Sequence, residues 1–132
     1  MMVLHPFFSY PTIILALLVF TMYAIALLKV RSLSKYALYL NGILILFALL
    51  SVIFGFRISS VPLVQSKTPI IWGFPHKWSG ILLLLFSVLT FIVFWFKGES
   101  SSKKLIVLPV IGILLTLFQF FTGWMLRLVF FS

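Results

Sequence analysis

The sequence predicts an all-α, polytopic membrane protein in which four helices form an up-down-up-down transmembrane bundle. Hydrophobic residues make up 64% of the 132 residues, and charged residues only 8%. A soluble domain carries about 25% charged residues, so this chain could not cover itself with a water-compatible surface. The composition therefore favours a lipid bilayer as its solvent. The length predicts a single domain, residues 1–132.

The four predicted spans cover approximately residues 7–29, 36–56, 76–97 and 105–129. A helix needs about 20 apolar residues to cross the hydrocarbon core, and each span reaches that length. The spans are continuously apolar and lack the alternation of a barrel strand, which favours helices. The first span has no preceding Lys or Arg and no cleavage site after it, so we do not expect a signal peptide.

The connections differ in length and charge. Residues 31–35 are predicted as a tight turn. The segment from about Arg57 to Lys77 is predicted as a long, proline-containing loop, either against the membrane surface or over the mouth of the bundle. The connections after the first and third spans carry six basic residues and the opposite side carries four: respectively Lys29, Arg31, Lys35, Lys97, Lys103 and Lys104, and Arg57, Lys67, Lys77 and Arg127. Because cytoplasmic loops carry the excess of Lys and Arg, we expect both termini to be extracytoplasmic.

The two histidines of the chain precede the first and third spans, at His5 and His76. In an up-down-up-down bundle these spans start at the same face, so the two histidines should share one membrane depth. The first and third helices of such a bundle lie diagonally across the core. Two imidazoles that face each other there suit the two axial positions of a haem iron. The pattern therefore favours a haem held between His5 and His76.

Other residues at the same end agree with a haem site. Arg57 and Arg127 end the second and fourth spans, and with Lys77 they could pair with the two haem propionates. Gly80 comes four residues after His76 and so shares its helix face. A flat macrocycle between helices needs the volume that a missing side chain leaves. Arginines also snorkel to headgroups, and small residues serve helix contacts generally.

The start of the first helix decides how His5 can act. Proline favours the first helical position, and both Pro6 and Pro11 are candidates. A start at Pro6 places His5 at the helix cap, from where it can reach inward. A start at Pro11 places His5 in an extended segment, and Met125 is then the alternative soft ligand.

The segments LHPFFSY, MYAIALLKVRS, FPHKWSGILLLL and LFQFFTGWMLRL resemble parts of small transmembrane b-type cytochromes, the ascorbate-cytochrome and ferric-reductase-like group and its four-helix relatives. The resemblance involves all spans but the second. It implies a haem b between paired histidines in a four-helix core. Members of this group typically keep a second histidine pair near the other face. The corresponding positions, near 36–41 and 104–112, hold no histidine here, so we expect one haem at most, near the outer face.

The sequence offers fewer residues for functions other than haem binding. The span interiors hold no acidic or basic residue, which disfavours a proton pump or coupled transporter. Gln119 and Thr122 share a helix face and could hydrogen-bond a quinone carbonyl or a pigment, or else a neighbouring helix. The chain has no cysteine and shows no hydrolytic or transferase motif. Its net charge of +9 is scattered among the span ends, which disfavours nucleic-acid binding.

The sequence thus predicts an electron-transfer protein or subunit that exchanges electrons with a quinol, a soluble carrier or a neighbouring subunit. The main alternative is a cofactor-poor accessory subunit of a larger respiratory or photosynthetic membrane complex. Aromatic residues at 18% and a single acid, Glu99, fit a protein that rarely meets water. A separate lipid- or pigment-binding protein is the third possibility.

Overall fold

The computed structural model describes residues 4–59, 70–97 and 103–131, with the side chains of residues 9–57, 75–97, 103–126 and 128. Four long helices make up nearly all of it: α1 (Leu4–Leu28), α2 (Leu33–Ser59), α4 (Ile70–Lys97) and α5 (Val107–Phe131), with a short 3₁₀ turn, η2 (Lys103–Ile106), before α5. Each of the four helices is long and apolar enough to cross a membrane. The predicted all-α four-helix class is confirmed, and it is consistent with an integral membrane protein in a lipid bilayer.

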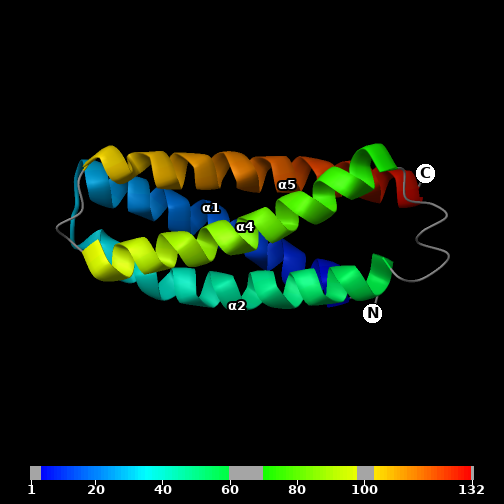
Figure 1. Cartoon of the computed structure of the whole chain (residues 1–132), viewed down its shortest axis with the longest axis horizontal. Helices are drawn as coiled ribbons and strands as arrows, with labels where there is room; N and C mark the ends of the chain where they lie inside the picture. Colours follow the sequence, from blue (N-terminus) through cyan, green and yellow to red (C-terminus); the bar gives the residue numbers. More distant parts are fainter. Residues whose placement is uncertain (1–3, 60–69, 98–102, 132) are drawn as a thin grey trace.

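The helices run antiparallel in chain order, and both termini lie at one end of the bundle (Figure 1). Helix α1 packs mainly against α2 and α5, and α4 packs against the same two helices. Helices α1 and α4 are therefore the diagonal pair, and they start at the same end, as the sequence predicts. We call this end, where α1 and α4 start, the histidine end, and the other the connection end.

Helices α2 and α4 start earlier than the sequence predicts. Helix α2 starts at Leu33, so residues 33–35 are helical rather than part of a turn. A hydrogen-bonded turn leads into it, because the Leu33 and Ser34 amides donate to the Val30 and Arg31 carbonyls. Helix α4 starts at Ile70 rather than near residue 76, so the predicted long loop is shorter. Residues 60–69 lie outside the described part of the chain.

Among the described residues, two prolines lie beyond the first turn of a helix. Pro11 is within α1, which starts upstream of both prolines that the sequence offers as first helical residues. This places the backbone of His5 in the first turn of α1. Pro75 lies in the second turn of α4. A proline there removes one intrahelical hydrogen bond, and the apolar residues before it still continue the helix, which is why sequence reasoning placed the start too late.

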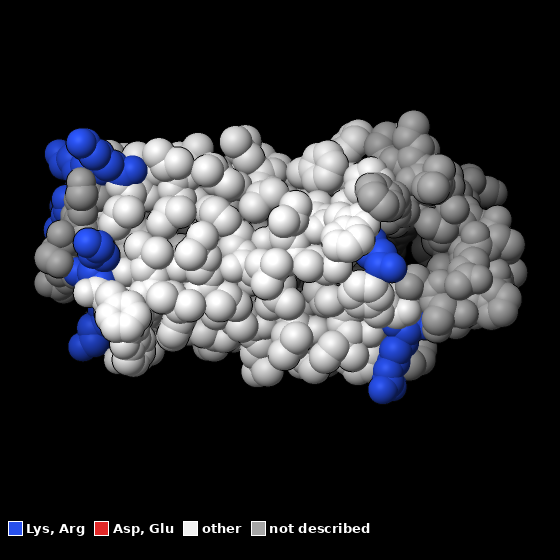
Figure 2. All heavy atoms as spheres, in the orientation of Figure 1, with Lys and Arg blue, Asp and Glu red and all other residues white. Residues whose placement is uncertain are grey.

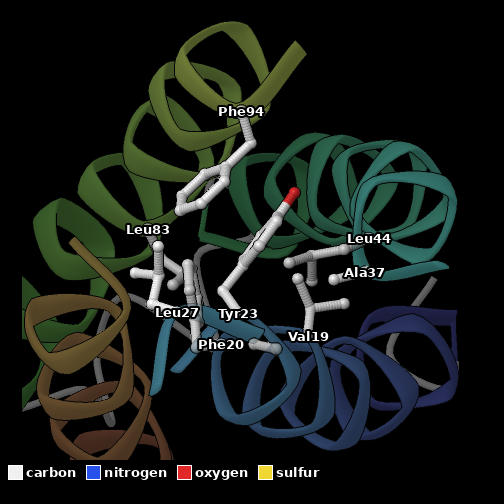
Figure 3. Close-up of a cluster of buried hydrophobic side chains, with 9 residues drawn as sticks. Val19, Phe20, Tyr23, Leu27, Ala37, Leu44, Leu83 and Phe94 are labelled. Atoms are coloured by element: carbon white, nitrogen blue, oxygen red, sulfur yellow. The ribbon is translucent and has the colours of Figure 1, made fainter. Parts of the chain in front are cut away.

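The core changes in character along the bundle. At the connection end it is built from large side chains with at most 2% exposure, including Phe20, Tyr23, Leu27, Leu44 and Phe94 (Figure 3). The Tyr23 and Phe94 rings stack with centroids 4.1 Å apart, which joins α1 to α4 across the diagonal. Toward the histidine end the buried residues are small or polar: Thr12, Ala16, Ala48, Ser79 and Thr122.

The outer surface separates charge from apolar side chains. On the face shown in Figure 2, Lys and Arg lie at the two ends and the long middle is uncharged. Large apolar side chains such as Ile14, Leu46, Leu85 and Leu114 are more than half exposed on the four helices. An outward apolar belt between two charged ends is the arrangement that a bilayer favours.

Candidate functional site

His76 lies near the start of α4 and contacts α5. Its ring is half-buried, and Nδ1 lies 2.9 Å from the Thr122 hydroxyl oxygen. Its other nitrogen, Nε2, lies 3.5 Å from the Gln119 side-chain nitrogen. The histidine therefore belongs to the interface between α4 and α5, where both its ring nitrogens meet polar groups of α5.

Two further hydrogen bonds connect the groups around His76. The Ser79 hydroxyl donates to the Gln119 side-chain oxygen and also lies 3.1 Å from the His76 carbonyl. The Thr122 hydroxyl donates to the Gln119 backbone carbonyl at 3.1 Å. Ser79 is 4% exposed and Thr122 only 1%. We call these four residues, His76, Ser79, Gln119 and Thr122, the His76 cluster.

Two glycines, Gly80 and Gly123, lie directly against side chains of this cluster. A Cβ atom on Gly123 would lie 3.0 Å from the His76 ring, and one on Gly80 would lie 3.0 Å from the Gln119 side-chain nitrogen. Both distances are tighter than ordinary van der Waals contact. The missing side chains therefore let α4 and α5 approach closely enough for the cluster to form. The space beside Gly80, which the sequence assigns to a macrocycle, is next to Gln119 here.

The sequence reasoning found part of this cluster. It selected His76 for its chemistry, and Gln119 and Thr122 as a polar pair on one helix face, and all three meet in the structure. It did not select Ser79, although Ser79 follows His76 by three residues and so shares its helix face. The polarity of this face of α4 was the available signal.

The other predicted site residues lie at the histidine end in different ways. Arg57 is exposed near the end of α2. Lys77 is also exposed, and its Nζ lies 4.6 Å from the centroid of the Phe56 ring, a cation–π distance. The backbones of His5 and Arg127 belong to α1 and α5 at this end. Their side chains lie outside the described part of the structure, so the predicted pairing of His5 with His76 remains a prediction.

Helices α1 and α2 also contribute polar side chains at this end. The hydroxyl oxygens of Ser9 and Ser51 lie 2.7 Å apart and join the two helices. Thr12, one turn further along α1, is 5% exposed. The histidine end therefore has buried or half-buried hydroxyl groups on all four helices.

A second polar cluster surrounds Asn41 on α2, toward the connection end, and Asn41 is fully buried. With its amide oriented to match its neighbours, Oδ1 accepts from the Tyr23 hydroxyl at 2.9 Å and from the Phe91 amide at 3.2 Å. The Nδ2 group donates to the Ser87 carbonyl at 3.2 Å. An uninterrupted helix would join those two backbone groups of α4 to each other. Asn41 therefore connects α1, α2 and α4, and its polar atoms are all paired within the protein.

Within the described residues, no group of three or more His, Cys, Asp or Glu side chains could hold a metal ion. A haem iron needs only one or two protein ligands, because the macrocycle supplies four. Comparisons with protein-family models, with curated proteins and with solved structures found no match.

Proposed function

We propose that the chain is a membrane b-type cytochrome-like electron-transfer protein or subunit, which binds one haem b at the histidine end. The observation that carries this proposal is the setting of His76. Its Nδ1 has a hydroxyl partner on α5, while its Nε2 faces an amide at 3.5 Å, the limit of a hydrogen bond. Iron-ligating histidines commonly use one ring nitrogen for the metal and the other for such a partner.

The fold supports a second axial ligand from α1. Helices α1 and α4 are diagonal and start at the same end (Figure 1), and His5 lies in the first turn of α1. The buried residues of α1 and α2 near this end, such as Thr12, Ala16 and Ala48, are small. A flat group would displace less side-chain volume there than among the aromatic rings of the connection end.

Basic residues at the same end would pair with the propionates. Arg57 and Lys77 are both exposed there, on α2 and α4, and Arg127 belongs to α5 near the same end. Gly80 lies on the face of α4 that carries His76, and the Gln119 side chain would have to move from beside it to admit a macrocycle. When bound, haem iron alternates between its ferric and ferrous forms and so carries one electron. The protein supplies the imidazoles, the low dielectric and the charges that set the potential.

The proposed electron donors and acceptors are a quinol, a soluble carrier or a neighbouring subunit at the histidine end. The alternative, a cofactor-poor accessory subunit of a larger membrane complex, rests on the apolar side chains exposed around the bundle. Both lipid and partner helices would cover such a surface. The two proposals differ in whether the purified chain contains haem.

The test is the visible spectrum of the protein produced with an ample supply of haem, first oxidised and then reduced with dithionite. We expect a reduced-minus-oxidised haem b signal in the wild type and its loss in His76→Ala, because an axial ligand is removed. His5→Ala should alter the signal by removing the other ligand. Tyr39→Phe, a change at an exposed position on α2 near the connection end, should leave the spectrum unchanged.

A wild-type protein that is folded but has no haem signal would overturn the proposal and favour the accessory subunit. A signal that persists unchanged in both histidine variants would contradict the ligand assignment.

We further propose that both termini are extracytoplasmic, because the connection end carries six of the ten Lys and Arg residues. The chain has no cysteine, so single cysteines can report the orientation without interference. Ser32→Cys lies between α1 and α2 at the connection end, and Ser59→Cys lies at the end of α2. Neither substitution changes a charge.

In intact cells, a membrane-impermeant maleimide should label Ser59→Cys, whereas Ser32→Cys should react only after the cells are permeabilised. The opposite labelling pattern would reverse the proposed orientation.

A further inference from the structure

We infer that Thr122 is a positioning residue, which fixes His76 in the tautomer with its proton on Nδ1 and so turns the lone pair of Nε2 toward Gln119. The importance of this lone pair as an iron ligand rests on the proposed function. The tautomer itself does not, because it follows from hydrogen bonds within the protein.

The first argument concerns Nδ1. It lies 2.9 Å from the Thr122 hydroxyl oxygen, which has a single proton to donate. That proton is directed to the Gln119 backbone carbonyl, at 3.1 Å. With its proton on that carbonyl, the hydroxyl oxygen accepts from His76, and we infer that Nδ1 carries the proton. A neutral imidazole has one protonated nitrogen, which leaves a lone pair on Nε2.

The second argument reaches the same result from the other side of the ring. The Ser79 hydroxyl donates to the oxygen of the Gln119 side chain. This bond orients the amide so that its NH₂ group, a pure donor, faces Nε2 of His76 at 3.5 Å. A donor in that position suits an acceptor nitrogen and would repel an N–H group. Two contacts, one at each ring nitrogen, thus agree on a single tautomer.

Burial of the surrounding groups restricts the orientation of the His76 ring. Thr122 and Ser79 are at most 4% exposed, so water does not compete for their hydroxyl groups. A Cβ atom on Gly123 would be 3.0 Å from the ring, which shows how closely the imidazole packs on the α5 backbone. The ring is therefore fixed in orientation as well as in protonation.

The two ring nitrogens then have different roles: Nδ1 donates a hydrogen bond to Thr122, and Nε2 is the nitrogen that could bind iron. When one ring nitrogen of a histidine binds a metal and the N–H of the other donates to an oxygen, the histidine is a more basic ligand and its ring has a fixed direction. Here Thr122 would provide that oxygen. The Gln119 amide occupies the position facing Nε2, at a distance long enough for a stronger ligand to replace it.

The tautomer can be measured on the full-length chain in lipid nanodiscs, without haem, by nitrogen NMR of protein labelled with ¹⁵N-histidine. The His5→Gln variant leaves His76 as the one labelled histidine. At a pH where the imidazole is neutral, we expect a protonated Nδ1 and an unprotonated Nε2. Thr122→Val, which keeps the shape but loses the acceptor, should shift the population toward the form with the proton on Nε2. Thr122→Ser should restore the original signals.

A protonated Nε2 in the otherwise unaltered protein would overturn the inference, because every donor in the cluster would then be reversed. This measurement needs no Thr122 variant and so remains decisive if Thr122→Val does not fold. Signals that are identical in folded Thr122→Val would also overturn it.

The haem spectrum provides an independent readout. In haem-loaded protein, Thr122→Val should shift the reduction midpoint while Thr122→Ser stays near the wild-type value, and equal midpoints in both would contradict the role of Thr122 in positioning a ligand. If the NMR signals are as expected and no haem is bound, the proposed function fails and the tautomer assignment stands.

Discussion

Gly112→Ala is expected to lower the free energy of unfolding of the bundle by about 1–3 kcal/mol, the usual cost of overpacking a well-packed core. A Cβ atom at this position would lie 2.5 Å from two carbon atoms of the Phe20 ring. Phe20 is fully buried and its ring cannot move into open space. Helix α5 would therefore have to move away from α1, with loss of packing along their interface.

The neighbouring hydroxyl adds to the expected cost. The Thr116 side chain donates to the Gly112 carbonyl at 2.7 Å in the buried part of α5. A shift of this turn would therefore disturb a buried hydrogen bond as well as apolar contacts.

Gly42→Ala is the matched control. Its added Cβ would be 3.7 Å from the Phe91 ring, an ordinary van der Waals contact. We expect this variant to be neutral or stabilised by up to about 1 kcal/mol, because alanine favours a helix more than glycine does. Both variants can be compared by near-ultraviolet circular dichroism during unfolding in mixed detergent micelles. Equal stabilities of the two variants would contradict the close approach of α1 and α5.

The second large effect is expected from Asn41→Leu, which should lower the free energy of unfolding by about 1–2 kcal/mol. Leucine has nearly the same size but cannot pair with the buried Tyr23 hydroxyl, which would then lack its partner at 2.9 Å. The backbone groups at Ser87 and Phe91 can bond to each other as in a regular helix. The unpaired tyrosine hydroxyl is therefore the main source of the cost.

A double-mutant cycle with Tyr23→Phe tests this explanation. Tyr23→Phe alone should cost less, because Asn41 keeps its two backbone partners on α4. The double variant should be no less stable than Asn41→Leu, because it removes the orphaned hydroxyl together with its lost partner. Strictly additive losses in the two single variants would show that the two side chains do not interact.

The sequence predicted most of the fold because the bilayer restricts the possible structures. Continuous apolar segments of about 20 residues must be helical in lipid, and four of them with short connections predict an antiparallel bundle. That topology also placed His5 and His76 at one end. The errors were at helix starts, at Leu4, Leu33 and Ile70, where polar or proline-containing residues already belong to a helix that apolar composition alone would begin later.

The sequence alone predicted the candidate site less completely than the fold. His76, Gln119 and Thr122 stand out as polar residues in apolar surroundings, and sequence reasoning selected each of them. It considered them for two different ligands, however, because nothing in the linear chain relates residue 76 to residues 119 and 122. The contact between them depends on how α4 rotates about its axis and where it approaches α5.

The sequence by itself determined the four membrane-spanning helices, their order, and the end of the bundle that carries the histidines, since these follow from hydrophobic length and the direction of the chain. The tertiary structure alone decided which groups each polar side chain meets. Gly123 lets His76 approach α5 closely, and Gly80 lets Gln119 approach α4. Gly112 does the same for Phe20 against α5. Such contacts depend on differences of less than 1 Å between packed helices, and hydrophobic patterning does not specify distances at that scale.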